Sequence, residues 1–143
     1  MKKLLAIGIT AALASGLSFA AIAQSGITRE VSTAHAHAAM AQGASSVSMS
    51  HTHLHHVINC LVGPQGHGFD AAAGNPCKGQ GNGALPDSAN NHALHRKLQN
   101  ALSDARAGLK ASSLGDVHKD AAKAAAALQA GSMKSDSMKS SGS

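Results

Sequence analysis

Four histidines and a cysteine lie within the ten residues HTHLHHVINC, at positions 51 to 60. His51 and His55 are four residues apart, and His53 and His56 are three apart. At either spacing a helix projects two imidazoles from one face, with Cβ atoms about 5 to 6 Å apart, so that both can share one ion. Imidazole suits Cu, Zn and Ni, whereas Ca and Mg prefer oxygen ligands, and the only glutamate, Glu30, lies outside this stretch. The stretch therefore predicts a transition-metal site.

A helical projection divides these histidines between two faces. At 100° per residue, the apolar stripe of residues 54 to 62 is centred between Leu54 and Ile58, and His51 and His55 lie on its edge. The other ligand-type residues of the stretch project to the opposite side: His53, His56 and Cys60. We therefore expect the first pair of histidines to face the core and the second pair to face away from it.

Histidines elsewhere in the chain can join the inward pair. If residues 43 to 46, GASS, form a hairpin turn, positions equidistant from it face one another, which places His35 near His55. His95, in a further HxxH pair with His92, falls at a similar level on a later helix. The predicted metal site has four members: His35, His51, His55 and His95. The secondary candidates are His53, His56 and His92.

Two other interpretations of the histidines have to be weighed. They can be solvated side chains of a structural or interaction protein, which is the rival hypothesis. They can also ligate haem. Because C-x-x-C-H, the motif of covalent attachment, is absent, such a haem would be of the non-covalent b type. A core this poor in large apolar residues would cover a porphyrin badly: after position 23 there are nine Leu, five Val, two Ile and one Phe, or 17 of 120 residues. The methionines can supply soft thioether ligands for Cu(I): Met40, Met49, Met133 and Met138. Met40 and Met49 can equally be packing residues.

The elements that must position these groups are helices. Apolar spacing and capping residues predict helices over residues 27–42, 48–62, 90–111 and 114–131, with Ser48 or Ser50 starting the second and Gly131 ending the last. Short first and third links favour an all-α fold, an antiparallel four-helix bundle, in which ligand sites form between facing helices. Residues 63–89, rich in Gly and Pro, are expected to form a long loop without regular structure.

Cys60 and Cys77 are the only cysteines, and an even count in an exported chain predicts a disulfide. The bond would pin the middle of the 63–89 loop to the end of the second helix. The alternative, in which both thiolates bind metal, is disfavoured by an oxidising compartment.

The first residues have the layout of an export signal. Lys2 and Lys3 precede an apolar run that ends in Ala21-Ile22-Ala23, which predicts a signal peptide over residues 1–23 and a periplasmic or secreted product without stable membrane insertion after processing. Residues 24–131 then form one helical domain, and residues 132–143, with a repeated SMKS, a disordered tail. A net charge of +3 after cleavage, with neither Trp nor Tyr, argues against nucleic acid as a partner.

The run HTHLHHVINCLVGPQGHGFDAAAGNPCKGQGNG, preceded by HAHAAMA, resembles a segment of small exported His-rich proteobacterial proteins. The whole chain is also loosely similar to small periplasmic His-rich metal-binding proteins with helical bundles. It departs from these in its clustered histidines and its cysteine-bounded loop. No hydrolase spacing or phosphate-binding turn is present, so the chain is not expected to be an enzyme. The sequence predicts an exported buffer or carrier of Cu, Zn or Ni, and indicates no particular protein partner.

Overall fold

The structure, a computed structural model, describes the backbone of residues 18–140 and the side chains of residues 26–129. Within residues 18–140 every regular element is a helix, so the all-α prediction is confirmed. The helices are α1 Ser18–Gly43, α2 Val47–Val62, α3 Ala84–Asp87, α4 His92–Lys110 and α5 Leu114–Ser140.

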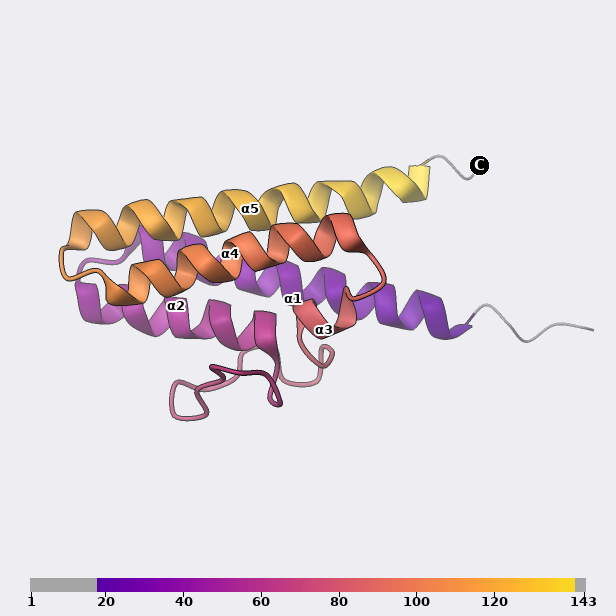
Figure 1. Ribbon diagram of the computed structural model, residues 1–143, viewed down its shortest axis with the longest axis horizontal. Helices are drawn as coiled ribbons and strands as arrows, with labels where there is room; N and C mark the ends of the chain where they lie inside the picture. Colours follow the sequence, from indigo (N-terminus) through magenta and orange to yellow (C-terminus); the bar gives the residue numbers. More distant parts are fainter. Residues whose placement is uncertain (1–17, 141–143) are drawn as a thin grey trace, which may run out of the picture.

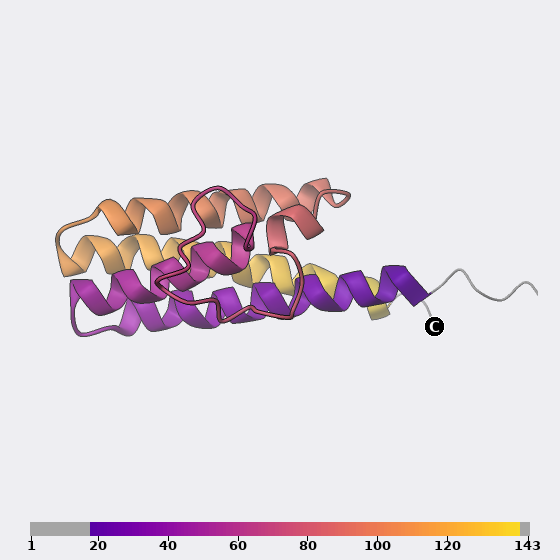
Figure 2. The ribbon, with the colours of Figure 1, turned by 90° about the horizontal axis from the view of Figure 1, so that it is seen from below.

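The four long helices lie side by side, and each runs opposite to the long helix before it (Figure 1). Helix α1 packs against α2 and α5, and α4 packs against the same two helices. The 63–89 loop leaves the end of α2 and passes along the α1 and α2 side of the molecule (Figure 2). One side of the α1–α2 hairpin is therefore covered by loop rather than by helix.

Local signals set where the second and fourth helices begin. Ser46 is in extended conformation before α2, and its side chain accepts a hydrogen bond from the backbone N–H of Met49. Asn91 does the same for α4, with its Oδ1 3.1 Å from the backbone N of Leu94. Such caps satisfy N–H groups that have no partner inside the helix. Helix α2 therefore begins before Ser48 and Ser50, the starts predicted from the sequence.

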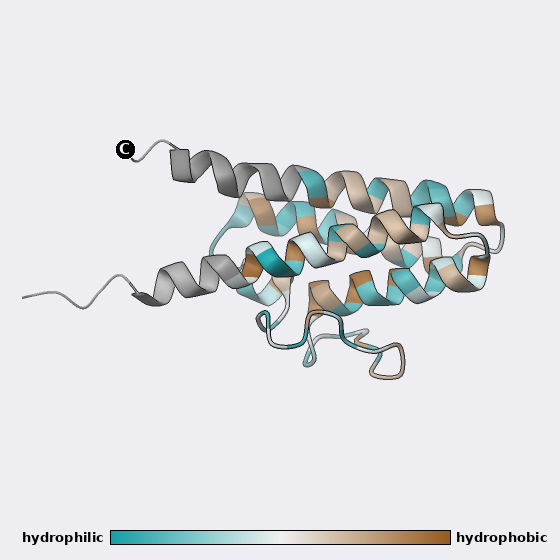
Figure 3. Ribbon diagram, turned by 180° about the vertical axis from the view of Figure 1, so that it is seen from behind, coloured by the Kyte–Doolittle hydropathy of each residue, from teal (hydrophilic) through white to brown (hydrophobic). Residues whose placement is uncertain are grey.

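The core is built on small residues as much as on large ones. Hydrophobic and hydrophilic residues alternate along the helices (Figure 3), and the apolar ones that are fully buried include Ala34, Ala38 and Ala121. Gly108 shows how closely the helices approach, because a Cβ there would lie 2.7 Å from Cδ1 of Leu54 on α2. Small side chains at these positions allow the close packing that gives a chain with few large apolar residues a continuous core.

The 63–89 loop is ordered by bonds to α2. Cys60 and Cys77 form a disulfide with their Cα atoms 5.2 Å apart, which confirms that prediction and leaves no cysteine thiolate as a metal ligand. One residue earlier, the buried Asn59 donates from Nδ2 to the carbonyl oxygens of Asp70 and Gly74, at 2.7 and 2.6 Å. The loop is thus fastened to the last turn of α2 by a covalent bond and by amide hydrogen bonds.

The far end of the loop is held by Glu30 of α1, which is 1% exposed. Its Oε1 accepts a hydrogen bond of 2.8 Å from the backbone N of Gly83, while Oε2 has no hydrogen-bond partner among the described residues. The next residues form the short helix α3, whose Pro86 sits in the first turn, where proline is tolerated. The prediction that no regular element occurs within residues 63–89 was wrong at this point.

Two long helices extend past the limits expected from the sequence. Helix α5 continues through Gly131 to Ser140, because a glycine inside a helix costs only about 1 kcal/mol relative to alanine and no proline follows it. Helix α1 begins at Ser18, so the predicted signal peptide lies partly on its first residues and otherwise on residues 1–17, outside the described part. No helix in the described part of the chain is sufficiently long and apolar to cross a bilayer.

Candidate metal centre

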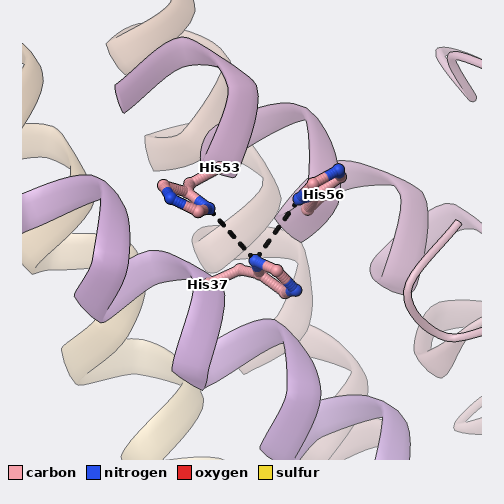
Figure 4. Close-up of side chains that lie close together, drawn as sticks. All are labelled: His37, His53 and His56. Atoms are coloured by element: carbon pink, nitrogen blue, oxygen red, sulfur yellow. Dashed lines mark hydrogen bonds between the residues drawn. The ribbon is translucent and has the colours of Figure 1, made fainter. Parts of the chain in front are cut away.

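Three histidines converge on the side of the α1–α2 hairpin. His37 comes from α1, and His53 and His56 come from α2 (Figure 4). Nδ1 of His37 lies 3.3 Å from Nδ1 of His53 and 3.3 Å from Nδ1 of His56. Among the described residues this is the one group of three or more His, Cys, Asp or Glu side chains close enough to hold a metal ion, with ligand atoms all within 4.8 Å of one another. We call these three residues the histidine cluster.

The hairpin register brings the cluster together. Ser50 donates from Oγ to the carbonyl oxygen of Ala41 at 2.9 Å, which pairs the two helices close to their connecting turn. His37 precedes Ala41 by four residues and His53 follows Ser50 by three, so the two histidines lie at similar distances from that turn and face each other across the seam. His56, three residues after His53, projects from the same face of α2 one turn later.

The spacing of the nitrogens matches what a tetrahedral ion needs. Two nitrogens bound to one Zn²⁺ at about 2.0–2.1 Å lie ~3.3–3.4 Å apart when the angle between the bonds is tetrahedral. The two contacts made by Nδ1 of His37 have that length. The remaining pair, His53 and His56, has ligand atoms within 4.8 Å, and rotation of either ring can bring them closer. The cluster therefore offers three donors around one point and leaves a fourth position open.

The loop selects the tautomer of His56. Nε2 of this residue lies 2.7 Å from the carbonyl oxygen of Ala73. A carbonyl oxygen only accepts, so Nε2 carries the proton and Nδ1 of the neutral ring presents its lone pair toward His37. A hydrogen bond of this kind at the distal nitrogen orients metal-binding imidazoles and raises their basicity.

Two histidines of the cluster disfavour protonation. The pKa of His37 is lowered to about 4, first by burial and then by the neighbouring His56 and His53, because a proton on one ring repels a proton on the next. The pKa of His53 is lowered too, first by burial and then by His56. No carboxylate belongs to the group. At neutral pH the ring of His37 is therefore uncharged and retains one nitrogen lone pair, which coordination requires.

The structure uses two of the four predicted inward histidines for other bonds. Nε2 of His51 donates to the carbonyl oxygen of Gly108, 3.1 Å away. Nδ1 of His55 lies 3.4 Å from a carboxylate oxygen of Asp70 in the loop. These contacts tie α2 to α4 and to the loop, so the edge of the apolar stripe holds structural partners and not a shared ion.

The remaining predicted residues lie apart from the cluster. Nδ1 of His95 is 3.1 Å from the carbonyl oxygen of Leu85 and 3.1 Å from the hydroxyl of Ser88. His35 is half-buried and His92 is exposed. Among the described residues, no three-ligand group includes His35, His51, His55, His92 or His95. Of the secondary candidates, His53 and His56 are brought together.

His37 was missed by sequence reasoning, although a signal for it was present. The rule that positions equidistant from the turn face one another pairs His37 with His53 as well as His35 with His55. Of these two pairs, only His37 and His53 belong to a common cluster. The face of α2 that carries His53 is covered by α1 and the loop. Cys60, on that same face, is fully buried.

A second concave surface lies elsewhere, between the loop, α3 and α4. Its volume is about 620 Å³, and its polar groups include His67 and Arg106. Arg106 donates to the carbonyl oxygen of His67 at 3.0 Å, so its guanidinium is partly engaged in holding the loop. No group of metal-ligand residues lies there in the described part of the chain.

Comparisons of the chain with protein-family models, with curated proteins and with solved structures found no match. The chemistry of the cluster is therefore argued from the contacts of this chain alone.

Proposed function

We propose that this protein is an exported binder of a transition-metal ion, acting as a buffer or carrier rather than as an enzyme, and that His37, His53 and His56 hold the ion. One observation carries the proposal: Nδ1 of His37 lies 3.3 Å from the Nδ1 atoms of both other histidines. Three imidazole nitrogens facing one another without carboxylates suit Cu, Zn or Ni and not Ca or Mg.

The surroundings of the cluster support reversible binding. All three side chains are partly exposed, so an ion can reach them from solvent. Three protein ligands also leave a position for water or for a ligand of an acceptor molecule, as a carrier requires. Nothing among the described contacts supplies a substrate pocket at the cluster.

The disulfide supports export. A bond between Cys60 and Cys77 persists in an oxidising compartment and is rare in the cytosol. Together with the apolar N-terminal run that ends at Ala23, it favours a periplasmic or secreted protein from which residues 1–23 are removed.

The alternatives are less well supported by the geometry. Histidines that serve only to keep a surface soluble have no reason to face one another with partly buried rings. A haem iron with two histidine ligands on opposite faces holds nitrogens ~4 Å apart with the porphyrin between them. The 3.3 Å separations in the cluster leave no room for a porphyrin.

Metal titration of tag-free protein tests the proposal. We expect one ion of Cu(II), Zn(II) or Ni(II) per chain by calorimetry, together with a rise in melting temperature, since an ion at 100 times its Kd stabilises the folded state by about 2.7 kcal/mol. The double variant His53→Ala with His56→Ala should lose most of this rise.

The double variant His51→Ala with His55→Ala is the matched control, because it removes two imidazoles from the same helix and should keep the metal-dependent rise. His37→Ala and His35→Ala form a second such pair on α1. Absence of any metal-dependent shift in the unaltered protein at about pH 7.5 would reject the proposed function. Equal losses in the two α2 variants would show that the cluster is not the site.

A further inference from the structure

Two methionines are exposed beside the histidine cluster. Met40 is 49% exposed and Met49 is 48% exposed, and they are the large apolar side chains in the described part of the chain that are exposed. Other large apolar residues, such as Leu54 and Leu98, are fully buried. Because the chain has few large apolar groups with which to build a core, the exposure of two of them on one hairpin calls for an explanation.

Both methionines lie one helical turn from a cluster residue. Met40 follows His37 by three residues on α1, and Met49 precedes His53 by four on α2. At either spacing the Cβ atoms are about 5 to 6 Å apart on one face. The hydrogen bond from Ser50 to Ala41 shows that the two helices are paired at the level of the methionines. The four residues therefore occupy one stretch of the α1–α2 seam.

The direction of side chains on a helix brings the sulfur of Met40 toward the cluster. Side chains lean toward the N-terminus of their helix, over the residues three and four positions earlier. Met40 thus leans over His37, and the ring of His53 leans over Met49. Methionine is also long and unbranched, so its sulfur can move to meet an ion.

The donor set that results is soft and uncharged. Thioethers are soft ligands that select Cu(I), while imidazole accepts copper in both oxidation states and also Zn and Ni. Imidazoles and thioethers are all neutral, and no Asp or Glu belongs to the cluster. A partly buried divalent ion would therefore keep two uncompensated charges, whereas Cu(I) brings one.

From these observations we infer that the cluster is a copper site selective for Cu(I), in which His37, His53 and His56 supply nitrogen ligands and the thioether sulfur of Met40 or Met49 fills the open fourth position. This inference rests on the proposed function and names its metal. Met40 and Met49 are exposed because their sulfur atoms serve the ion rather than the core.

Replacing both methionines by leucine tests the inference in the full tag-free protein. The variant Met40→Leu with Met49→Leu keeps apolar side chains of similar volume and removes only the sulfur. Affinity for Cu(I) is measured without oxygen, in the presence of ascorbate, by competition with a chromogenic Cu(I) chelator, and affinity for Zn(II) by competition with a chromogenic zinc chelator. We expect the Kd for Cu(I) to rise at least about tenfold, which corresponds to roughly 1.4 kcal/mol, while the Kd for Zn(II) changes less than about threefold.

The control is Met133→Leu with Met138→Leu, which removes two sulfur atoms from the last part of α5, at the opposite end of the molecule from the α1–α2 turn (Figure 1). It should leave both affinities unchanged. An unchanged Cu(I) affinity in the Met40 and Met49 variant overturns the inference and leaves the proposed function standing. Failure of the unaltered protein to bind either metal overturns the proposed function itself. Equal weakening of Cu(I) and Zn(II) overturns the inference too, because it would show a packing role for the methionines.

Discussion

Helix α1 carries two ionisable groups, the buried Glu30 and the half-buried His37, whose pKa values respond to burial in opposite ways. His37, near the connection to α2, has its pKa lowered to about 4, whereas Glu30, two turns earlier, has its pKa raised to about 7. In both cases removal from water is the largest cause, and it favours the uncharged form. Between those two pH values the base has lost its proton and the acid has kept one, so both groups are neutral.

The neighbours of each group explain what it is suited to do. His37 faces two further bases, which add to the effect of burial and whose Nδ1 atoms both lie 3.3 Å from its own. Glu30 faces Asp87, which raises its pKa, while the hydrogen bond from Gly83 and the charge of Arg29 lower it. Its Oε1 accepts the hydrogen bond from Gly83, which joins α1 to the loop, and protonation removes the negative charge from the buried carboxyl group. One end of the helix is therefore suited to bind an ion and the other to hold a loop.

Removal of the disulfide should disturb the contacts of both His37 and Glu30, and we expect it to have the largest effect on stability. The loop closed by Cys60 and Cys77 supplies the acceptor for His56 at Ala73, and the segment that follows Cys77 supplies the donor for Glu30 at Gly83. We expect Cys60→Ala with Cys77→Ala to lose about 3 kcal/mol of unfolding free energy in urea, the value for a loop of this length. The metal affinity should fall as well, because His56 loses its orienting partner. A variant that loses stability but binds metal as before would show that the cluster does not depend on the loop.

Stability measured against pH in the metal-free protein should distinguish the contribution of Glu30 from that of His37. Because the folded-state pKa of Glu30 lies above its usual 4.5, the folded chain binds more protons than the unfolded chain between about pH 4.5 and 7, and stability falls as pH rises through that range. For His37 the sign is opposite, so its contribution falls as pH drops from 6.5 toward 4. Stability should therefore be greatest near pH 5 to 6.

The replacement Glu30→Gln tests whether Glu30 causes the loss of stability on the alkaline side of the pH profile. It should remove a decline on the order of 2 kcal/mol between pH 5 and pH 8, as measured by urea unfolding, and leave the acidic side unchanged. Asp87→Asn should shift the midpoint of the decline to lower pH, because it removes a negative neighbour that raises the pKa of Glu30. A profile that is identical in the unaltered protein and in Glu30→Gln would refute a buried, protonated Glu30.

The smallest expected effect concerns the start of α2. Ser46→Ala removes the side-chain acceptor for the N–H of Met49 and should reduce stability by about 1 kcal/mol. Ser46 lies in the connection between α1 and α2, which is closer in sequence to His37 and His53 than to Glu30. We therefore expect a modest rise in the Kd for metal and no change in the alkaline pH dependence. A change in that dependence would mean that the two ends of α1 are coupled.

Much of the fold could be predicted from the sequence because the helices depend on local patterns of apolar residues. The stripe that includes Leu94, Leu98 and Leu102 predicts one face of α4, and the structure buries all three. The pairing of two cysteines in an exported chain predicts the disulfide. Helix α3 was missed because its four residues are too few for any periodicity to appear.

The candidate site was harder to predict because a projection of one helix treats the face opposite its apolar stripe as solvent. In the structure that face of α2 is covered, and Cys60 on it is fully buried. The predicted disulfide already implied this, since a loop bonded to Cys60 must lie over the residues beside it. Combining that constraint with the hairpin register would have joined His37 to His53 and His56.

The histidine cluster is also local in the chain, because His53 follows His37 by 16 positions and His56 follows it by 19. Contacts this close in sequence form early, since short loops close rapidly and helical hairpins are among the fastest structures to assemble. The chain can therefore acquire its ion as soon as the α1–α2 hairpin has formed, before α4 and α5 have docked. Metal would then act on the rate of folding as well as on stability, and stopped-flow refolding should be faster with metal present from the start. A slower unfolding arm with an unchanged refolding arm would contradict that order of events, because it would mean that metal binds only after the folding transition state.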